Sequence, residues 1–360
     1  MLKYVHVIIN SAYTSPYINL VKENFDFEEH AFFVVRGWSE SKVKIPVGNN
    51  IYPITNKKNI LNGFKLISKM NQSKKIFFHG LFTPYLLLIL IIHPWLLKKS
   101  NWIIWGSDLY EYKSIRDTIF KKLEEFFRRI VFSRFAEITT VIKGDYDLAK
   151  KWYKVKGVHK YAMYSVPLKL NQIDEITGSV VSSKDTNFTS ILIGNSSDPG
   201  NYHYEIFDIL TKYKSDNIKI YALLNYGDKA YAQEVIAYGK TIFGESFIGV
   251  TDYMEFKDFV LFMNDIDIIV FNHKRQQALG NLLLAYYLEK KIFLNTNSTL
   301  YEYFKQDLCL TINSTLDIQE MEFNNFKYQS KQDAANNKIG IQRILEKRYI
   351  IDQWSALFDK

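Results

Sequence analysis

The feature that most constrains the fold of this chain is a regular alternation of short apolar runs with longer stretches of helical pattern. In the first part of the sequence the apolar runs are VHVIIN, AFFVV, KIFFHG and NWIIWG, and helical patterns lie between them at 19–25 and 59–70. Strands that alternate with helices build βαβ units, in which the strands are parallel and share one sheet. The pattern therefore predicts an α/β protein.

Residues 168–187 interrupt this alternation with a polar stretch rich in Ser, Asn, Asp and Thr, which is typical of a linker. A length of 360 residues also favours two domains, because single cores rarely grow beyond ~250–300 residues. The alternation then resumes with strand-like runs at 190–193, 218–224, 247–250, 266–271 and 292–294.

The predicted first domain spans 1–167, and a linker at 168–188 joins it to a second domain at 189–330. The last segment, 331–360, has a helical pattern and is expected to pack back on the first domain. Two such domains form a cleft, and ligands of open parallel sheets bind beyond the carboxyl ends of the strands. The loops that follow the strands are therefore the places to look for functional residues.

Charge is divided unevenly along the chain. Residues 1–167 hold 26 Lys/Arg and 13 Asp/Glu, a net +13, whereas 168–360 hold 20 and 25, a net −5, which together give the +8 of the whole chain. A basic half indicates an anionic partner. Nucleic acid, an anionic membrane surface and a phosphorylated substrate all meet this condition, and composition leaves the choice open.

The most apolar stretch, YLLLILIIHPWLL at 85–97, has 13 residues, whereas a membrane-spanning helix needs about 20. It is predicted to be either a buried core helix or an interfacial segment that dips into a bilayer. The first residues lack the pattern of a signal peptide. We therefore expect a cytoplasmic protein, placed at the membrane face.

Two neighbouring loops of the first domain carry titratable side chains. His79 and Gly80 follow one strand, and Trp105, Gly106 and Asp108 follow the next. His79 or Asp108 could act as a general base towards an acceptor hydroxyl, and glycine lets the backbone approach a ligand closely. The alternative is a structural histidine and an aspartate that caps the next helix.

The second domain opens with a strand that runs into Gly194, Asn195 and Ser196, ahead of a helix. Small residues and backbone amides at a helix start form a natural cradle for phosphate. The sequence lacks the Gly-Lys-Ser/Thr ending of a P-loop and the three spaced glycines of a dinucleotide site. A plain turn with a helix cap is the alternative.

A later loop of this domain is more strongly charged. Lys274 and Arg275 follow a strand, and Gln276, Gln277 and a helix come next. Arg275 can hold a diphosphate through two hydrogen bonds, and Lys274 adds a point charge. The two glutamines could bind hydroxyl or amide groups of a sugar, and Tyr226 could stack on a base or sugar. The alternative is a solvated charge pair.

No metal site is predicted. The chain has one cysteine, Cys309, which excludes a disulfide framework and Cys-based zinc sites, and its histidines show no His-x-x-x-His spacing. The Asp-x-Asp pairs at 145–147 and 265–267 are expected to cap a helix and to precede a strand. We therefore expect a metal-independent site without a cofactor.

The strand-end loops resemble those of the bacterial 4-acetamido-4,6-dideoxygalactosyltransferases, which are known from enterobacterial common antigen synthesis. The resemblance implies a GT-B glycosyltransferase, with two Rossmann-like domains facing across a cleft. It further implies transfer of 4-acetamido-4,6-dideoxygalactose from a dTDP-sugar, with a UDP-sugar as the other option, to a polyprenyl-diphosphate-linked glycan of common antigen or O-antigen. Four stretches in order carry it: FFHGLFTP at 77–84, WIIWGSDLYE at 102–111, ILIGNSSDPGNYH at 191–203 and RQQALGNLLL at 275–284.

The resemblance implies a donor site in the second domain and an acceptor site on the basic first domain, at the cytoplasmic face of the bacterial inner membrane. The chain departs from the family pattern at Ala278, which replaces glycine, and after Asn225, where Tyr-Gly-Asp replaces a longer loop. The matching donor-side residues are Gly194, Asn195, Ser196, His203, Arg275, Gln276, Gln277 and Gly280. The matching acceptor-side residues are His79, Gly80, Trp105, Gly106, Asp108, Leu109 and Tyr110.

The expected mechanism is glycosyl transfer without a metal. Arg275, Lys274 and the helix start after Gly194 would stabilise the negative charge of the leaving dTDP, and Asp108 is preferred to His79 as the base. A non-catalytic nucleotide or nucleic-acid binding protein and a sugar-nucleotide epimerase stay open as alternatives. Because the basic residues interleave with large apolar ones, a membrane surface is favoured over a nucleic-acid groove.

Overall fold

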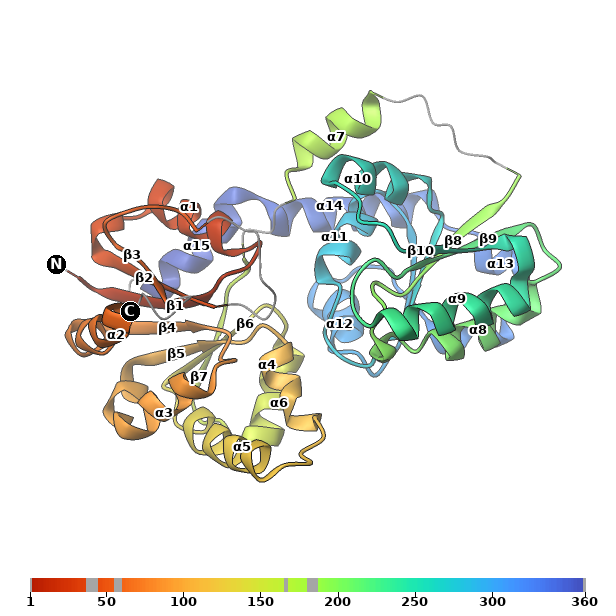
Figure 1. The fold of residues 1–360 in the computed structure, drawn as a ribbon. Coiled ribbons are helices and arrows are strands. Elements are labelled where there is room, and N and C mark those ends of the chain that lie inside the picture. The colour runs from red at the N-terminus through yellow and green to blue at the C-terminus, as the bar shows by residue number, and fades with distance from the viewer. Residues whose placement is uncertain (1, 37–44, 55–59, 165–167, 180–186, 359–360) are drawn as a thin grey trace. The chain divides into compact units, whose positions relative to one another are not determined.

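The computed structural model describes residues 2–36, 45–54, 60–164, 168–179 and 187–358 (Figure 1). The chain forms two compact units. The first unit consists of Met1–Pro167 and Leu345–Lys360, and the second of Leu168–Ile344. Each unit has its own parallel sheet with helices packed on it, so the predicted α/β class is confirmed.

The first unit is built on a sheet of seven parallel strands in the order β3-β2-β1-β4-β5-β6-β7. The central strand β1 pairs with both β2 and β4, so the chain extends the sheet to one side of β1 and then returns to extend it to the other. The strands are β1 (Tyr4–Ile9), β2 (His30–Val35), β3 (Ile51–Ile54), β4 (Lys75–His79), β5 (Ser100–Ile103), β6 (Glu137–Thr140) and β7 (Val158–Tyr161).

Helices cover both faces of this sheet, as Figure 1 shows. Right-handed crossovers place helices on one face when the sheet grows one way and on the other face when it grows back. One face carries α1 (Thr14–Asn24) and α15 (Lys347–Phe358). The other face carries α2 (Ile60–Gln72), α3 (Pro84–Ile92), α5 (Ile119–Phe132) and α6 (Lys143–Tyr153), and α4 (Ser107–Tyr110) is a single turn after β5.

Helix α15 completes the first unit, although the whole second unit precedes it in the sequence. Trp354 is fully buried, and its indole N–H donates to the carbonyl of Met163 at 2.9 Å. The Lys75 ammonium donates to the carbonyl of Leu357 at 2.9 Å. Of the segment 331–360, this last helix lies in the first unit, whereas nearly all of α14 (Lys331–Leu345) lies in the second.

The apolar stretch 85–97 does not form one continuous helix. α3 ends at Ile92, and a short 3-10 helix (Pro94–Lys99) follows, because Pro94 cannot donate the hydrogen bond that would continue α3. Leu86, Leu87 and Leu90 are buried in the core, whereas the opposite side of the helix is exposed. Nowhere in the described ranges is a helix long and apolar enough to cross a membrane.

The second unit contains six parallel strands in the order β10-β9-β8-β11-β12-β13. Here β8 is the strand from which the sheet grows in both directions, because it pairs with β9 and with β11. The strands are β8 (Thr189–Ile193), β9 (Ile218–Leu223), β10 (Phe247–Val250), β11 (Ile268–Phe271), β12 (Lys291–Leu294) and β13 (Asn313–Ser314). The helices are α7 (Leu170–Gly178), α8 (His203–Leu210), α9 (Lys229–Phe243), α10 (Phe256–Asp265), α11 (Leu279–Tyr287), α12 (Thr299–Glu302), α13 (Phe323–Lys327) and α14.

The stretch expected to be a linker contains helix α7, which belongs to the second unit. Ile173 and Ile176 form a short apolar stripe that is buried where α7 packs against α10. Tyr287 of α11 donates to the carboxylate of Asp174 at 2.8 Å. Two isoleucines in a polar stretch are a weak helical signal, and packing rather than periodicity stabilises this helix.

Candidate functional site

The loop after β8 is the first part of the candidate donor site. Gly194 has a φ of +59°, and a Cβ at this position would overlap the imidazole Nε2 of His203, the first residue of α8. Only glycine combines this backbone conformation with such close packing. The positive φ and the closely packed His203 therefore explain why glycine follows this strand.

The loop after β11 is hydrogen-bonded directly to the loop after β8. The side-chain amide of Gln277 donates to Asn195 Oδ1 at 2.8 Å and to Asn201 Oδ1 at 3.1 Å. Arg275 Nε donates to Gln277 Oε1 at 2.6 Å, and an outer nitrogen of its guanidinium donates to Asp198 Oδ2 at 2.9 Å. Because β8 and β11 are adjacent, the two predicted donor loops meet where the sheet changes its direction of growth.

Lys274 is held in a second set of polar contacts beside the first. Its ammonium lies 3.2 Å from Glu205 Oε1 and 4.0 Å from the centre of the Tyr202 ring. Glu205 also accepts a hydrogen bond from the amide of Asn272 at 2.8 Å. Asn272 in turn accepts one from Asn295 of the loop after β12 at 2.8 Å. The loops after β8, β11 and β12 are thus connected by polar contacts at the carboxyl edge of this sheet.

Tyr226, after β9, completes this edge. Its hydroxyl accepts a hydrogen bond from the amide of Asn195 at 2.7 Å, while 57% of the residue stays exposed. Burial of the hydroxyl raises the pKa of Tyr226, so it stays protonated at neutral pH. The ring is exposed, and its stacking on a base or sugar stays a prediction.

The start of α11 contains one departure from the family pattern, at a position whose backbone favours glycine. Ala278 occupies the left-handed region at φ 60°, immediately before the helix begins at Leu279. A glycine adopts this conformation without strain, whereas an alanine does so at a cost. At Gly280 a Cβ would meet no atom within 4 Å, so packing does not require glycine there. Gln276 is half-buried in the same turn.

Two buried histidines at this edge have an imidazole nitrogen without a hydrogen-bond partner among the described residues. These atoms are Nε2 of His203 and Nε2 of His273. The other nitrogen of each is engaged: His203 Nδ1 lies 3.2 Å from the Tyr231 hydroxyl, and His273 Nδ1 lies 2.9 Å from the carbonyl of Arg275. Burial lowers the pKa of both to about 4, so both are neutral at pH 7.

In the first unit, His79 belongs to a row of buried histidines on three neighbouring strands. Its Nε2 lies 3.1 Å from Nδ1 of His6, and Nε2 of His6 lies 2.9 Å from Nδ1 of His30. The hydroxyl of Tyr164 is hydrogen-bonded to Nδ1 of His79. Burial lowers the pKa of His79 to about 3, that of His30 to about 4, and that of His6 well below its usual value.

Asp108 is fully buried in the neighbouring loop, where both carboxylate oxygens accept hydrogen bonds. The donors are the Trp102 indole at 2.7 Å, the backbone N–H of Trp105 at 3.0 Å and that of Leu81 at 3.2 Å. Burial raises the pKa of Asp108, and these hydrogen bonds and the nearby Arg128 oppose that rise. Asp108 therefore fastens the loops after β4 and β5 to each other, and its role as a base stays a prediction.

The other acceptor-side residues surround these two. The indole N–H of Trp105 donates to the Tyr164 hydroxyl at 3.0 Å, which connects the Asp108 loop to the histidine row. Gly80 and Gly106 have φ values of 72° and 94°, which favour glycine. Leu109 and Tyr110 are buried in the core.

Several residues of both networks were not predicted from the sequence. Asp198, Asn201 and Glu205 lie within or just after the ILIGNSSDPGNYH stretch, so their polarity beside the predicted loop was an available signal. Tyr164 lies beyond the end of β7, and His6 lies inside a buried strand. Neither position carries a local pattern that could reveal contacts made across neighbouring strands.

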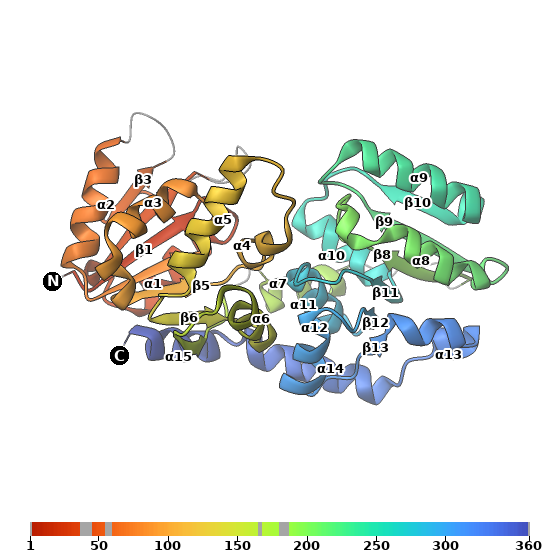
Figure 2. The same cartoon turned by 90° about the horizontal axis from the view of Figure 1, so that it is seen from below.

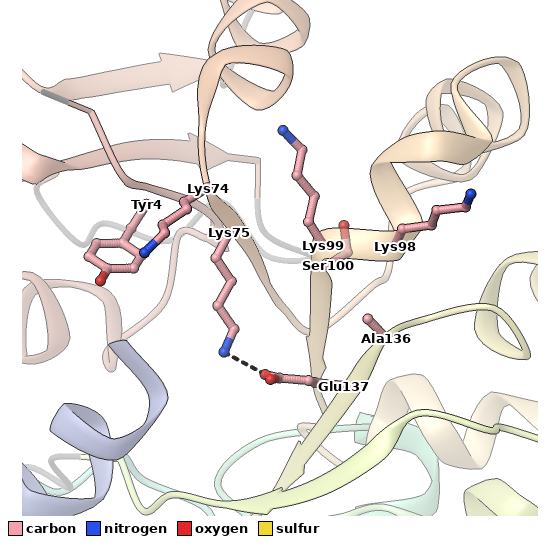
Figure 3. A pocket seen from close by; sticks show the side chains of 8 residues that line it. All are labelled: Tyr4, Lys74, Lys75, Lys98, Lys99, Ser100, Ala136 and Glu137. Carbon is pink, nitrogen blue, oxygen red and sulfur yellow. Dashed lines mark ion pairs between the residues drawn. The ribbon is translucent and has the colours of Figure 1, made fainter. Parts of the chain in front are cut away.

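A separate pocket of about 210 Å³ lies at the opposite edge of the first sheet, where strands begin (Figure 3). Lys75 lies 2.6 Å from Glu137, and Lys99 donates to two backbone carbonyls. Figure 3 shows the ammonium groups of Lys74, Lys75, Lys98 and Lys99 pointing away from one another, so they do not converge on one anion. Among the described residues no three His, Cys, Asp or Glu side chains are placed to hold a metal ion.

Solved structures with this architecture include proteins of known activity. HepE from Anabaena, solved with UDP and glucose, has a TM-score of 0.66 at 11% identity, with 99% of each chain covered. A glycosyltransferase from Rickettsia africae has a TM-score of 0.62 at 12% identity, covering 99% of this chain and 98% of its own. An α,α-trehalose-phosphate synthase (UDP-forming) from Burkholderia vietnamiensis has a TM-score of 0.64 at 7% identity, covering 99% and 100%. These similarities establish the GT-B fold.

Two Rossmann-like sheets of this kind, each with polar loops at its carboxyl edge, define the class of GT-B glycosyltransferases. The family model for 4-alpha-L-fucosyltransferases, glycosyl transferase group 56, matches residues 17–344, and the chain belongs to this family. The protein is therefore a glycosyltransferase, as the sequence predicts. The narrower resemblance to the common-antigen transferases stays a prediction.

Proposed function

We propose that this protein transfers 4-acetamido-4,6-dideoxygalactose from a dTDP-sugar to a polyprenyl-diphosphate-linked glycan during synthesis of a cell-surface polysaccharide, common antigen or O-antigen. The observation that carries the proposal is the joined pair of loops after β8 and β11. They bring Arg275, Lys274 and backbone amides of a tight glycine turn to one edge of the second sheet. Guanidinium, ammonium and backbone N–H groups are the donors that bind a diphosphate.

The family assignment and the motif resemblance agree on the carbon skeleton of the sugar. Fucose is 6-deoxygalactose, and 4-acetamido-4,6-dideoxygalactose has the same skeleton with an acetamido group at C4. The family model names fucosyl transfer. The family description thus supports a 6-deoxygalactose unit as the proposed sugar class, and the group at C4 is the finer part of the proposal.

The donor site proposed here uses the second unit alone. The diphosphate replaces Asp198 as the partner of Arg275, whose side chain is 38% exposed. The partial positive charge at the adjacent start of α11 adds to its binding. Tyr226 stacks on the base, and Gln276 and Gln277 bind the sugar. UDP-bound HepE supports a nucleotide donor by analogy of fold only.

In the proposed reaction the bond between sugar C1 and the diphosphate oxygen breaks while the acceptor hydroxyl oxygen bonds to C1. The electron pair of the broken bond stays with the departing dTDP, whose charge Arg275 and Lys274 stabilise. The hydroxyl proton passes to a base, for which Asp108 and His79 are the candidates. Both candidates and Tyr164 are buried in this structure, and the Tyr164 hydroxyl, which is hydrogen-bonded to His79, is the group through which His79 would take the proton. The proposed reaction needs no metal ion.

The proposed acceptor side is the first unit, at the cytoplasmic face of the inner membrane. Its sequence carries a net +13 in residues 1–167, which suits an anionic lipid surface and a diphosphate-linked lipid. Nucleic acid is not among the proposed partners.

The donor proposal is tested by thermal shift with dTDP- and UDP-sugars, followed by transfer to a synthetic polyprenyl-diphosphate glycan. A ligand that binds the folded state raises Tm, and the dTDP-sugar is expected to raise it most. Arg275→Ala is expected to weaken donor binding at least tenfold. Its loss removes charge-assisted hydrogen bonds that contribute about 1.5–3 kcal/mol, and about 1.4 kcal/mol corresponds to a tenfold change in Kd. Arg343→Ala, which removes an exposed arginine of the same unit, is the control.

Two outcomes would contradict the proposal. If no nucleotide sugar shifts Tm, the donor site is wrongly assigned. If Arg275→Ala binds donor like the wild type, the diphosphate does not meet this arginine. For the base, His79→Gln and Tyr164→Phe are expected to reduce the turnover rate together and to change its pH profile, whereas a purely structural role would leave that profile unchanged.

A further inference from the structure

Helix α5 of the first unit exposes apolar side chains along its first half and buries two charged ones, whereas Val131 and Phe132 near its end are buried in the core as usual. Its outward side exposes Ile119 (72%), Phe120 (80%), Leu123 (48%) and Phe126 (57%). Its buried residues include the charged Glu125 and Arg128. A surface helix of a water-soluble domain normally places its apolar stripe against the core and its charged residues in water.

Contacts to residues outside the helix hold α5 in this orientation. Arg128 donates to the carbonyl of Leu81 at 3.2 Å and to that of Asp108 at 3.3 Å. The carboxylate of Glu125 lies 3.0 Å from Arg116, which precedes the helix. Rolling the helix to bury its apolar side would break these contacts, so the exposed apolar side is built into the fold.

The apolar surface continues beyond α5 onto its neighbours. α3 packs against α5, and Figure 2 shows α2, α3 and α5 on the same side of the first sheet. α3 exposes Leu88 (51%) and Ile92 (58%), and Trp95 follows at 52%. α2 exposes Phe64 at 71%. Apolar side chains gathered over three neighbouring helices mark an interaction surface, whereas single scattered ones do not.

Positive charge accompanies this surface. The described part of residues 41–107, which includes α2, α3 and the turn after α3, contains six lysines and no acidic residue, and of these lysines only Lys75 is buried, beside Glu137. Beside Trp95 lies a hollow of about 710 Å³ whose lining combines Leu97 and Phe135 with Lys98 and Arg134. Apolar and aromatic side chains next to cations are the composition that binds the interface of an anionic membrane.

We propose that the outer surface of α2, α3 and α5, here called the apolar helix face, docks on an anionic lipid bilayer. Phe120, Phe126 and Trp95 enter the headgroup region, and the lysines beside them meet lipid phosphates. A second copy of the chain fits this face poorly, because pairing two such faces would bring acid-free, lysine-rich segments against each other. The inference rests on the proposed function only in one respect: membrane docking would bring the enzyme to a lipid-linked acceptor.

The test is co-sedimentation of the full-length chain with vesicles, without donor or acceptor. Vesicles of phosphatidylglycerol and phosphatidylcholine are compared with vesicles of phosphatidylcholine alone. We expect binding to the anionic vesicles that weakens as salt rises, and at least tenfold weaker binding for the double variant Phe120→Ser/Phe126→Ser. Both residues are exposed, so folding is expected to be kept, and the melting curve checks this.

The matched control is Tyr253→Ser/Leu316→Ser in the second unit, where the two apolar residues are 77% and 59% exposed. This control is expected to bind vesicles like the wild type. Equal binding of both double variants would overturn the proposed face, and equal binding to uncharged vesicles would overturn the role of anionic lipid. A lipid-free dimer that only Phe120→Ser/Phe126→Ser dissociates would show that a second copy covers the face.

Failure of this test and failure of the donor proposal can be told apart. Vesicle binding requires no nucleotide sugar, and donor binding in the thermal shift requires no lipid. A variant that loses vesicle binding but keeps its donor-induced Tm shift would confirm that the two surfaces are independent.

Discussion

The two units share a sheet architecture but use the carboxyl edge of the sheet in opposite ways. In the first unit the side chains at this edge, His79 and Asp108, are fully buried and bonded to their neighbours. In the second unit Arg275 and Lys274 keep 38% and 36% of their side chains exposed. The net charges show the opposite order, because the unit without exposed cations at this edge is the basic one: residues 1–167 carry +13 and residues 168–360 carry −5. Net charge therefore does not locate the candidate phosphate site, whereas exposed cations held in loops do.

The contrast between a buried and an exposed strand edge can be tested most strongly by replacing one arginine in each unit, Arg128 in the first and Arg275 in the second. Arg128 is buried, with 4% of its side chain exposed, and binds two carbonyls as well as Glu124. Arg128→Met is expected to lower the free energy of unfolding by about 3 kcal/mol, because it leaves buried acceptors without a donor. Arg275→Ala, at a half-exposed ion pair, is expected to change it by less than about 1 kcal/mol. Urea denaturation of both variants measures the difference, and equal losses would contradict the distinction.

The next effect concerns the glycine of the candidate donor loop. Gly194→Ala is expected to destabilise the protein by about 2 kcal/mol, because the new methyl group overlaps His203 at a positive φ. Gly63→Ala in α2 of the first unit is the control, since a Cβ there meets nothing within 4 Å. Its expected effect is neutral or slightly stabilising. If thermal melting finds the two variants alike, the tight loop is wrongly described.

The buried histidines predict how stability depends on pH. His30 and His79 of the first unit and His203 and His273 of the second have pKa values lowered by burial to about 4, 3, 4 and 4. In the unfolded chain these groups titrate near 6.5, so between pH 6.5 and 4 the unfolded state binds more protons. Stability is therefore greatest above pH 6.5 and falls below it, by about 1.4 kcal/mol per pH unit for each histidine.

Urea denaturation at pH 7, 6 and 5 measures this dependence. His79→Asn is expected to reduce the slope, because one titrating group is removed, whatever its effect on stability at pH 7. An unchanged midpoint between pH 7 and pH 5 would show that these histidines are already protonated, or in contact with water, in the folded protein.

The smallest effect is expected at the departure from the family pattern. Ala278→Gly is expected to stabilise the protein by about 1 kcal/mol, because it relieves the left-handed backbone strain before α11. Ala285→Gly, inside the same helix, is the control and is expected to destabilise it. Melting temperatures of the two variants should therefore shift in opposite directions, and a decrease in both would contradict the strain at Ala278.

The sequence predicted the parts of this molecule that depend on local pattern. Alternating runs predicted the α/β class, and the positions of β8 and β11 led directly to the loops of Gly194 and Arg275. The histidine row was missed because His6, His30 and His79 lie far apart in the sequence and meet only through strand pairing. The orientation of α5 could not be predicted either, because it depends on the ion pair of Glu125 with Arg116 and on the hydrogen bonds of Arg128 to two carbonyls outside the helix.

The position of α15 has a consequence for how the protein is made. The first unit lacks Trp354, which is fully buried in it, until the last sixteen residues have been synthesised. The second unit is continuous from Leu168 to Ile344 and leaves the ribosome first as a complete folding unit. The half of the molecule that begins the chain is therefore expected to be the last to reach its native state. Until α15 is in place, the face of the sheet that it covers, which includes Tyr4 of β1 and Phe77 of β4, would be accessible to chaperones.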